Sequence, residues 1–311
     1  MKELLKPLKP NKEQKMKYLK YLIIICIMFS AFSAGAEYTE PAQYLTYTPG
    51  GRALAMGGAF SSIANDSSAT FYNPAGIVQL RGASGELYYA MLDLDRTYIF
   101  LSYASPVTKS LSVGGYLLQY TISDIVGHDE IAFSTGTFDI SSNVLAISVG
   151  YRVSKQWALG LNLKSLSQNF RENTAEAFGA DFAILYGIDD KLGASLVFRD
   201  ISEKFSWDSG FEEEVPMITQ FGASYKIDRS WTASLEMSSR KDEKSTLHFG
   251  AEYSMGDLVA ALGYSDSLFS AGIGGNFKIS RTNSIGVNLV YKTEKEGFKP
   301  QLAFSVSYLT K

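Results

Sequence analysis

From Ser84 onward, the chain alternates between apolar and polar residues with a period of two. The pattern is clear in residues 231–238, where the odd positions from Trp231 to Met237 are apolar and the even positions are polar. The same alternation recurs in residues 157–164, 246–253 and 301–308. Successive side chains of a β-strand point to opposite faces, so each run predicts a strand with one apolar and one polar face.

About fourteen such runs lie between turn signals, an even number that falls within the range of single-chain outer-membrane barrels. The predicted strands start near Ser84, Arg96, Ser110, Ser141, Trp157, Glu176, Lys191, Ile218, Trp231, Ser245, Leu258, Phe269, Ser284 and Pro300. We therefore predict an all-β fold, a transmembrane antiparallel up-and-down β-barrel of about 14 strands with an N-terminal plug. The barrel is expected over residues 84–311.

The connections between the predicted strands carry a second signal. Every second connection is tight: 106–109, 154–156, 189–190, 228–230, 255–257 and 281–283. Among the others, Asp124–Asp139 and Ile201–Met217 are long. Short turns on one rim and longer loops on the other are typical of a membrane-spanning barrel. A soluble sandwich or propeller would also alternate, but the aromatic residues near the strand ends and the N-terminal export signal favour the barrel.

The N-terminus resembles a secretory signal peptide. Seven lysines precede an apolar run from Tyr21 to Phe32, which is followed by small residues ending at Ala36. An apolar run of about a dozen residues is short of the roughly twenty that span a bilayer as a helix. We expect residues 1–36 to be a signal peptide that is cleaved after Ala36, with translation starting at Met1 or Met16.

Cleavage at this position would change the charge and the thiol content of the chain. It removes seven Lys and two acidic residues, so the formal net charge changes from −3 to −8. It also removes Cys26, the only cysteine, which leaves no disulfide and no thiolate chemistry. An acidic exported chain is a poor binder of nucleic acid, so we expect outer-membrane lipid as a partner and no nucleic acid.

Residues 37–83 differ from the barrel in composition. Glycines flank a stretch of small residues, and Asp66 is expected to N-cap a short helical turn that runs to Tyr72. The turn should end at Asn73 because a proline follows, and Gly76 would permit a positive φ. Small residues allow close backbone approach, so this segment either packs inside the barrel as a plug or forms a periplasmic leader with ordinary turns.

Three blocks in this segment resemble a known family: residues 51–60 (GRALAMGGAF), 64–70 (ANDSSAT) and 72–76 (YNPAG). They are similar to the N-terminal signature of the PorV/PorQ family within the FadL-like outer-membrane proteins. Residues 198–201 with 215–225, and 248–253 with 263–264, are similar to later parts of that family. The resemblance implies a hatch over residues 37–83 that fills a fourteen-stranded barrel. Its motif residues are Gly57, Gly58, Asp66, Asn73, Pro74, Ala75 and Gly76.

No arrangement of residues in the sequence predicts catalysis, a cofactor or a metal site. The two histidines, His128 and His248, lack ligand spacing to another His or Cys. No nucleophile elbow, P-loop or dinucleotide fingerprint occurs between a strand and a helix. Polar residues on predicted inward faces could tune the passage of a solute, or could hydrate the interior and pair with the plug. These candidates are Lys164, Arg199, Glu236, His248 and Glu252.

These observations leave three hypotheses about function. The FadL-like resemblance implies a transporter in which the hatch moves to admit a small hydrophobic or amphipathic compound. The PorV-like resemblance implies an outer-membrane component of type IX secretion that receives exported proteins on its outer loops. A structural barrel is the third reading. We favour transport of small hydrophobic compounds, because nothing in the loops indicates a protein partner.

Overall fold

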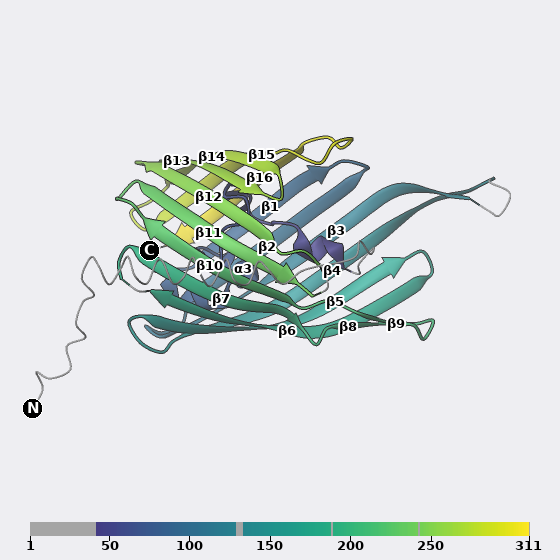
Figure 1. Cartoon of the computed structure of the whole chain (residues 1–311), viewed down its shortest axis with the longest axis horizontal. Coiled ribbons are helices and arrows are strands. Elements are labelled where there is room, and N and C mark those ends of the chain that lie inside the picture. Colours follow the sequence, from purple (N-terminus) through teal and green to yellow (C-terminus); the bar gives the residue numbers. More distant parts are fainter. Residues whose placement is uncertain (1–41, 129–132, 188, 242, 311) are drawn as a thin grey trace, which may run out of the picture.

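The chain forms a closed antiparallel β-barrel, seen in a computed structural model that describes residues 42–310 except 129–132, 188 and 242 (Figure 1). Fourteen strands, β1–β7 and β10–β16, make up the wall, and β1 pairs with β16 to close it. A short β8–β9 hairpin attaches to β6. The strand bounds are β1 Ser84–Leu92, β2 Arg96–Pro106, β3 Leu111–His128, β4 Ser134–Arg152, β5 Trp157–Phe170, β6 Asn173–Gly187, β7 Leu192–Ile201, β8 Lys204–Trp207, β9 Glu212–Glu214, β10 Ile218–Lys226, β11 Trp231–Arg240, β12 Thr246–Met255, β13 Leu258–Ser265, β14 Leu268–Lys278, β15 Asn283–Lys292 and β16 Gln301–Thr310.

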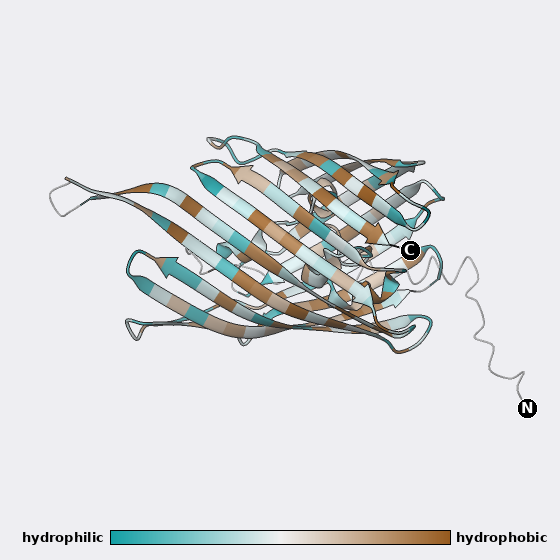
Figure 2. Cartoon of the chain, turned by 180° about the vertical axis from the view of Figure 1, so that it is seen from behind, coloured by the Kyte–Doolittle hydropathy of each residue, from teal (hydrophilic) through white to brown (hydrophobic). Residues whose placement is uncertain are grey.

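The period-two pattern positions the apolar residues on the outside of the wall. Along β5, for example, the outward side chains of Leu159, Leu161 and Leu163 are exposed, whereas Asn162 and Lys164 point inward and are buried. Figure 2 shows hydrophobic and hydrophilic residues alternating along the strands. The prediction of a fourteen-stranded barrel is therefore confirmed.

Two predicted loops contain additional strand structure. The predicted loop Asp124–Asp139 is mostly a projecting hairpin, in which β3 and β4 stay paired beyond a register shift near Asp124. The predicted loop Ile201–Met217 contains the β8–β9 hairpin. The outer half of the β3–β4 hairpin has no face packed on the lumen core, and β8–β9 contributes only Phe205 and Trp207 to it, so neither sequence shows the longer alternation on which the prediction relied.

The connections divide the barrel into two rims. The turns after β2, β4, β6, β10, β12 and β14 lie at one end, which we name the short-turn rim. The β3–β4 and β8–β9 hairpins lie at the other end, the long-loop rim, on the right of Figure 1. Among the helices of the described residues, none has the length and apolar character needed to cross a bilayer.

Residues 42–83, which we name the inner segment, lie within the barrel (Figure 1). The segment contains four short helices: η1 Gln43–Thr46, α2 Gly51–Ala55, α3 Ala69–Tyr72 and η2 Pro74–Gln79. Helix α2 packs against β13–β16 and η2 against β2–β6, so the segment crosses the lumen from one wall to the other. Most of its side chains are buried.

Two details of the inner segment differ from the predictions. Helix α3 begins at Ala69, and Asp66 instead accepts hydrogen bonds from the Ser68 amide and hydroxyl in the turn before it. Gly76 does not have a positive φ. Glycine is needed there because a Cβ would collide with the Ala64 carbonyl oxygen, so the requirement is for close backbone approach. Helix α3 does end at Tyr72, as predicted. Asn73 has an extended backbone, and its side chain caps η2 by accepting a hydrogen bond from the Ala75 amide.

Candidate functional site

The inner segment separates two cavities in the lumen. The long-loop cavity, of about 390 Å³, is bordered by Tyr47, Tyr72 and Arg199. The short-turn cavity, of about 170 Å³, is bordered by Ile63 and Gln79 on the other side of the segment. Any route through the barrel that joins these cavities must pass the inner segment, which the wall holds in position.

Carboxylates of the wall accept hydrogen bonds from backbone amides of the inner segment. Glu86 on β1 accepts from the Gly51 amide at 3.0 Å, and Glu236 on β11 accepts from the Ser61 amide at 2.8 Å. Both carboxylates are nearly fully buried, and Glu236 also accepts from Gln220. Buried polar groups are costly unless they are paired, so these contacts satisfy the wall and the segment together.

Arg52 ties helix α2 to β12 through a forked contact. Its guanidinium donates to both Glu252 oxygens, at 2.5 and 3.0 Å, and lies 3.3 Å from Asp66 of the inner segment. Burial would lower the pKa of Arg52, but the two carboxylates outweigh it and raise that pKa above its usual value. A planar guanidinium that engages both oxygens of a carboxylate fixes orientation as well as charge.

Glycines let the inner segment touch the backbone of β12 and β13. A Cβ on Gly263 would collide with the Gly57 amide nitrogen, and one on Gly250 would lie 2.7 Å from the Met56 carbonyl oxygen. Gly57 itself turns the chain at φ +65°, and the His248 ring donates from Nδ1 to its carbonyl at 2.8 Å. The contact on this side therefore depends mainly on the close approach of one backbone to the other.

The opposite wall carries a buried charged cluster formed by Lys164, Asp181, Asp200 and Glu203. Lys164 Nζ lies 2.8 Å from Asp181 and 2.5 Å from Glu203, and it also contacts Asp200. All four side chains are buried. One oxygen of each carboxylate lies within 4.8 Å of the others, a spacing that could hold a cation, and the Lys164 ammonium lies among them. Such a cluster is stable only if attraction and hydrogen bonding offset the loss of water.

The charged cluster forms where β7 bends. Asp200 and Ser202 adopt positive φ values of 59° and 56°, which turns the chain so that Glu203 points at Lys164. The Asp200 amide donates to Asp181 at 2.9 Å. Left-handed backbone costs free energy for residues other than glycine, and the cluster contacts hold this bend in place.

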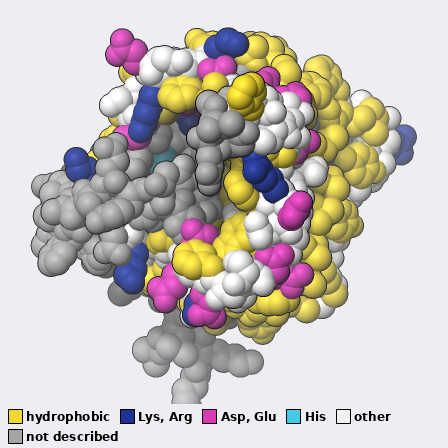
Figure 3. All heavy atoms as spheres, turned by 90° about the vertical axis from the view of Figure 1, so that its right-hand side faces the viewer, with side chains coloured by type: hydrophobic (Ala, Val, Ile, Leu, Met, Phe, Trp, Pro, Cys, Tyr) yellow, Lys and Arg dark blue, Asp and Glu magenta, His cyan; other side chains and the backbone are white. Residues whose placement is uncertain are grey.

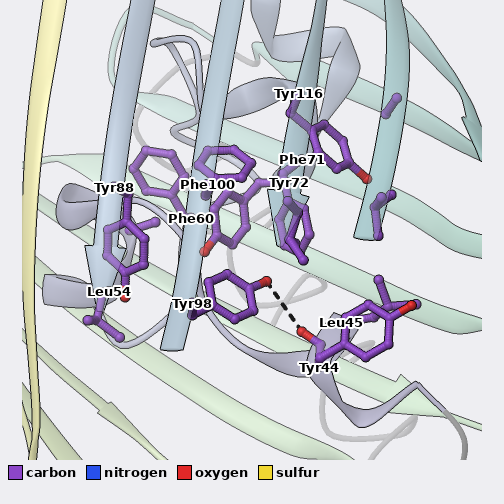
Figure 4. Packing of buried hydrophobic residues seen from close by; sticks show 14 of the residues in the cluster. Tyr44, Leu45, Leu54, Phe60, Phe71, Tyr72, Tyr88, Tyr98, Phe100 and Tyr116 are labelled. Atoms are coloured by element: carbon purple, nitrogen blue, oxygen red, sulfur yellow. Dashed lines mark hydrogen bonds between the residues drawn. The ribbon is translucent and has the colours of Figure 1, made fainter. Parts of the chain in front are cut away.

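Arg199 connects this wall to the inner segment. Its guanidinium lies 4.0 Å from the centre of the Phe71 ring and donates to the Leu45 carbonyl at 3.2 Å. Phe71 belongs to a layer of packed rings that joins the inner segment to β1–β3, shown in Figure 4. In that layer the Tyr98 hydroxyl donates to the Tyr44 carbonyl at 3.3 Å.

The mouth of the barrel at the long-loop rim is polar. Figure 3 shows acidic and basic side chains around this rim and an apolar surface along the outer wall. Lys244, Lys292 and Lys295 border the long-loop cavity together with Glu243 and Asp266. A solute that enters from this rim therefore meets charged groups first and the aromatic layer afterwards.

The structure brings most of the residues singled out from sequence to the contact between wall and inner segment. Of the five inward candidates, Arg199, Glu236, His248 and Glu252 contact the inner segment directly, whereas Lys164 belongs to the charged cluster. Asn73 donates to the Ser61 carbonyl at 2.7 Å. The remaining motif residues of the inner segment are Gly57, Gly58, Asp66, Pro74, Ala75 and Gly76.

Sequence reasoning missed four buried carboxylates: Glu86, Asp181, Asp200 and Glu203. Glu86 and Asp181 occupy inward positions of their strands, so the alternation of inward and outward residues could have identified them. Asp200 and Glu203 lie at or beyond the bend in β7, where the alternation along the strand no longer predicts which side chains point inward.

Comparisons with known proteins identify a shared fold. Neither models of protein families nor curated proteins match the sequence. Among solved structures, the monoaromatic hydrocarbon channel CymD superposes with a TM-score of 0.59 at 14% identity, covering 85% of this chain and 97% of that one. The Pseudomonas putida toluene transporter TodX gives 0.60 at 14% identity, covering 83% and 96%. A Pseudomonas aeruginosa FadL homologue gives 0.55 at 11% identity, covering 89% and 99%. The chain therefore shares its fold with these three proteins.

Proposed function

We propose that the protein is an outer-membrane channel for small hydrophobic compounds and that its inner segment acts as the hatch. The apolar outer wall supports a place in a membrane, and the solved structures of the same fold include channels for monoaromatic hydrocarbons and toluene. No catalytic residue is required for this function. The PorV/PorQ resemblance remains a prediction, and no observation favours the type IX secretion alternative.

One observation carries the proposal: the inner segment lies between two cavities and is held by separate polar contacts from several strands. Glu86, Glu236, Glu252 and Arg199 each reach it from a different part of the wall. Each hydrogen bond of this kind has a modest net free energy, because it exchanges with hydrogen bonds to water. A hatch needs contacts that order it when closed and allow it to shift.

The chain divisions that we propose follow from this function. Residues 1–36 serve as the export signal, cleaved after Ala36, and lie outside the described residues. Residues 37–83 form the hatch and 84–311 the barrel. The short-turn rim then faces the periplasm and the long-loop rim the exterior, as expected for a barrel inserted after export.

A reversible lock of the hatch tests the proposal. The hydroxyl oxygens of Ser61 in the inner segment and Ser195 on β7 lie 2.8 Å apart, so the pair Ser61→Cys and Ser195→Cys is placed to form a disulfide. Cleavage of residues 1–36 would leave no other cysteine. We expect cells that produce the oxidised double variant to take up radiolabelled toluene at the rate of cells without the barrel, and reduction to restore uptake.

The matched control is a lock that does not involve the hatch. Ser141 and Asn169 face each other on β4 and β5, so Ser141→Cys with Asn169→Cys would join two neighbouring strands. Uptake should be the same in the oxidised and reduced forms of this control. If the oxidised Ser61→Cys, Ser195→Cys variant takes up toluene as fast as its disulfide-reduced form, a moving hatch is refuted. If the wild-type protein takes up no toluene, toluene-like substrates are refuted.

A further inference from the structure

The two lumen cavities overlap around the barrel at only a few strands. The short-turn cavity borders β4–β7, β10 and β11, and the long-loop cavity borders β7 and β10–β15. Both cavities therefore reach β7, β10 and β11. Along the rest of the wall that the structure describes, at most one of the two cavities is present. The shortest connection between them thus lies against β7, β10 or β11.

Strand β10 separates the two cavities by the smallest distance. Its inward residue Gln220 borders the long-loop cavity, and its inward residue Ser224 borders the short-turn cavity. Only Gly222 lies between them on the inward face of β10. At a rise of roughly 3.4 Å per residue, the Cα atoms of Gln220 and Ser224 are about 14 Å apart. On β7 and β11 the corresponding separation contains two inward residues each, Ser195 with Val197 and Ser234 with Glu236.

At Gly222 the wall meets the inner segment through serine side chains. A Cβ on Gly222 would collide with the hydroxyl oxygens of Ser61 and Ser195 and would lie 3.2 Å from the Cβ of Ser62. The Ser61 and Ser195 oxygens lie 2.8 Å apart. We name this region the serine contact. Its residues are Ser61 and Ser62 of the inner segment and Ser195, Gly222, Ser224 and Ser234 of the wall.

The hydrogen bonds of Ser62 across the serine contact are long. Its hydroxyl oxygen lies 3.4 Å from that of Ser234, and the Ser224 hydroxyl donates to its carbonyl at 3.4 Å. Hydroxyl hydrogen bonds are usually about 2.7–2.8 Å long. Serine hydroxyls also change rotamer readily and can pair with water instead. Separating Ser62 from the wall therefore loses little hydrogen-bond energy.

The contacts of the inner segment with other walls consist of backbone atoms or packed rings. A Cβ on Gly160 of β5 would collide with the Ala75 amide nitrogen, and one on Gly263 of β13 would collide with that of Gly57. Against β1–β3 the segment packs through the aromatic layer. A backbone atom cannot rotate out of the way as a hydroxyl does, and close-packed rings lose dispersion energy when they separate. The serine contact is therefore the place where the segment leaves the wall most easily.

We infer that solutes cross the inner segment at the serine contact, between Ser61–Ser62 and Gly222. This inference rests on the proposed function and identifies the wall along which the passage opens. Gly222 keeps this passage clear because it has no side chain, and the two cavities hold the solute before and after it crosses. An added group on the serines that face Gly222 narrows the passage.

The test adds a small group to the serine contact after the protein has folded. Ser62→Cys changes one atom, and cleavage of residues 1–36 leaves the introduced cysteine as the only thiol. Cells that produce this variant are treated with methyl methanethiosulfonate, which attaches a methylthio group to the thiol, and dithiothreitol then removes that group. Uptake of radiolabelled toluene is compared before and after each step. Ser234→Cys is a second variant, with its thiol on the wall. Unlike a disulfide lock, the methylthio group leaves the inner segment free to move.

The matched control lies where the inner segment meets a different wall. Ser270 of β14 donates to the Ala55 carbonyl and is 5% exposed, against 6% for Ser62. Ser270→Cys receives the same treatment, as does the wild-type protein, and mass spectrometry measures how much of each thiol is modified. We expect uptake by Ser62→Cys and Ser234→Cys to fall about tenfold after modification and to recover on reduction. Uptake by Ser270→Cys should not change.

Three results would overturn the inference while the wild-type protein takes up toluene. Modified Ser62→Cys and Ser234→Cys could keep their uptake, both thiols could stay unmodified, or only Ser270→Cys could lose uptake. The first and third would place the passage elsewhere, and the second would show that small molecules do not reach the serine contact. A wild-type protein that takes up no toluene would instead refute the proposed function, and the inference with it.

Discussion

The two walls that hold the inner segment do so by different physical means. On β5–β7, the charged cluster fixes the bend that follows Arg199, and Arg199 itself contacts the segment. On β12–β13, the absence of side chains at Gly250 and Gly263 lets the backbones approach. The first wall depends mainly on charge balance, and the second mainly on volume, together with the Arg52–Glu252 pair on β12. The same segment should therefore respond to charge changes on one side and to size changes on the other.

The largest effect is expected from Lys164→Met. This change leaves three buried carboxylates without their shared cation, and removing one partner of a buried ion pair typically costs about 3–5 kcal/mol. We expect the free energy of unfolding in urea, measured in detergent micelles, to fall by that amount. Lys204→Met is the control, because the Lys204–Glu212 pair is exposed and its loss should cost less than about 1 kcal/mol. Similar losses for both variants would show that the charged cluster does not stabilise this wall.

A smaller effect is expected from Gly263→Ala on the opposite wall. The added methyl would collide with the Gly57 backbone, and overpacking of this kind costs about 1–3 kcal/mol. Gly85→Ala is a matched control, because its nearest neighbour would be the Ser102 carbonyl oxygen at 3.5 Å. That control should gain about 0.5–1 kcal/mol, as alanine does over glycine within a strand. The unfolding curves of Gly263→Ala and Gly85→Ala should thus shift in opposite directions. If both shift the same way, the contact between Gly263 and Gly57 does not depend on the missing side chain.

The smallest effect is expected where charge and geometry act together. Arg52→Lys keeps the positive charge but loses the forked contact with Glu252, so we expect a loss of about 1 kcal/mol. A double-mutant cycle with Glu252→Gln isolates the pair, and it should give a coupling energy of similar size. No measurable coupling would mean that Arg52 acts only through Asp66 and Asn65, which it also contacts.

The sequence predicted the barrel well because one physical rule governs nearly every strand. Along most strands an apolar outer face alternates with a more polar inner face, although β1–β3 also carry the aromatic layer inward. Six strands begin at the predicted residue, including β1 at Ser84 and β11 at Trp231. The rule fails where no face is packed on the lumen, as in the outer half of the β3–β4 hairpin. That is why the prediction placed the start of this strand at Ser141 rather than Ser134.

The candidate site was only partly predictable. Alternation identified the inward direction of Glu236, His248 and Glu252, but it could not reveal their partners, because those contacts join residues far apart in the chain. The charged cluster depends on the bend at Asp200. A left-handed backbone at a non-glycine residue is set by tertiary contacts, so local sequence carries little signal for it.

The pairing of β1 with β16 has a consequence for biogenesis. Ser84 pairs with Leu309, so the seam joins the first and last strands of the barrel and cannot form until β16 has been synthesised. The inner segment contacts both early and late strands, so its full set of contacts also depends on the presence of the last strands. Contacts between such distant residues fold slowly. The seam and the packing of helix α2 against β13–β16 are therefore expected to form late in folding.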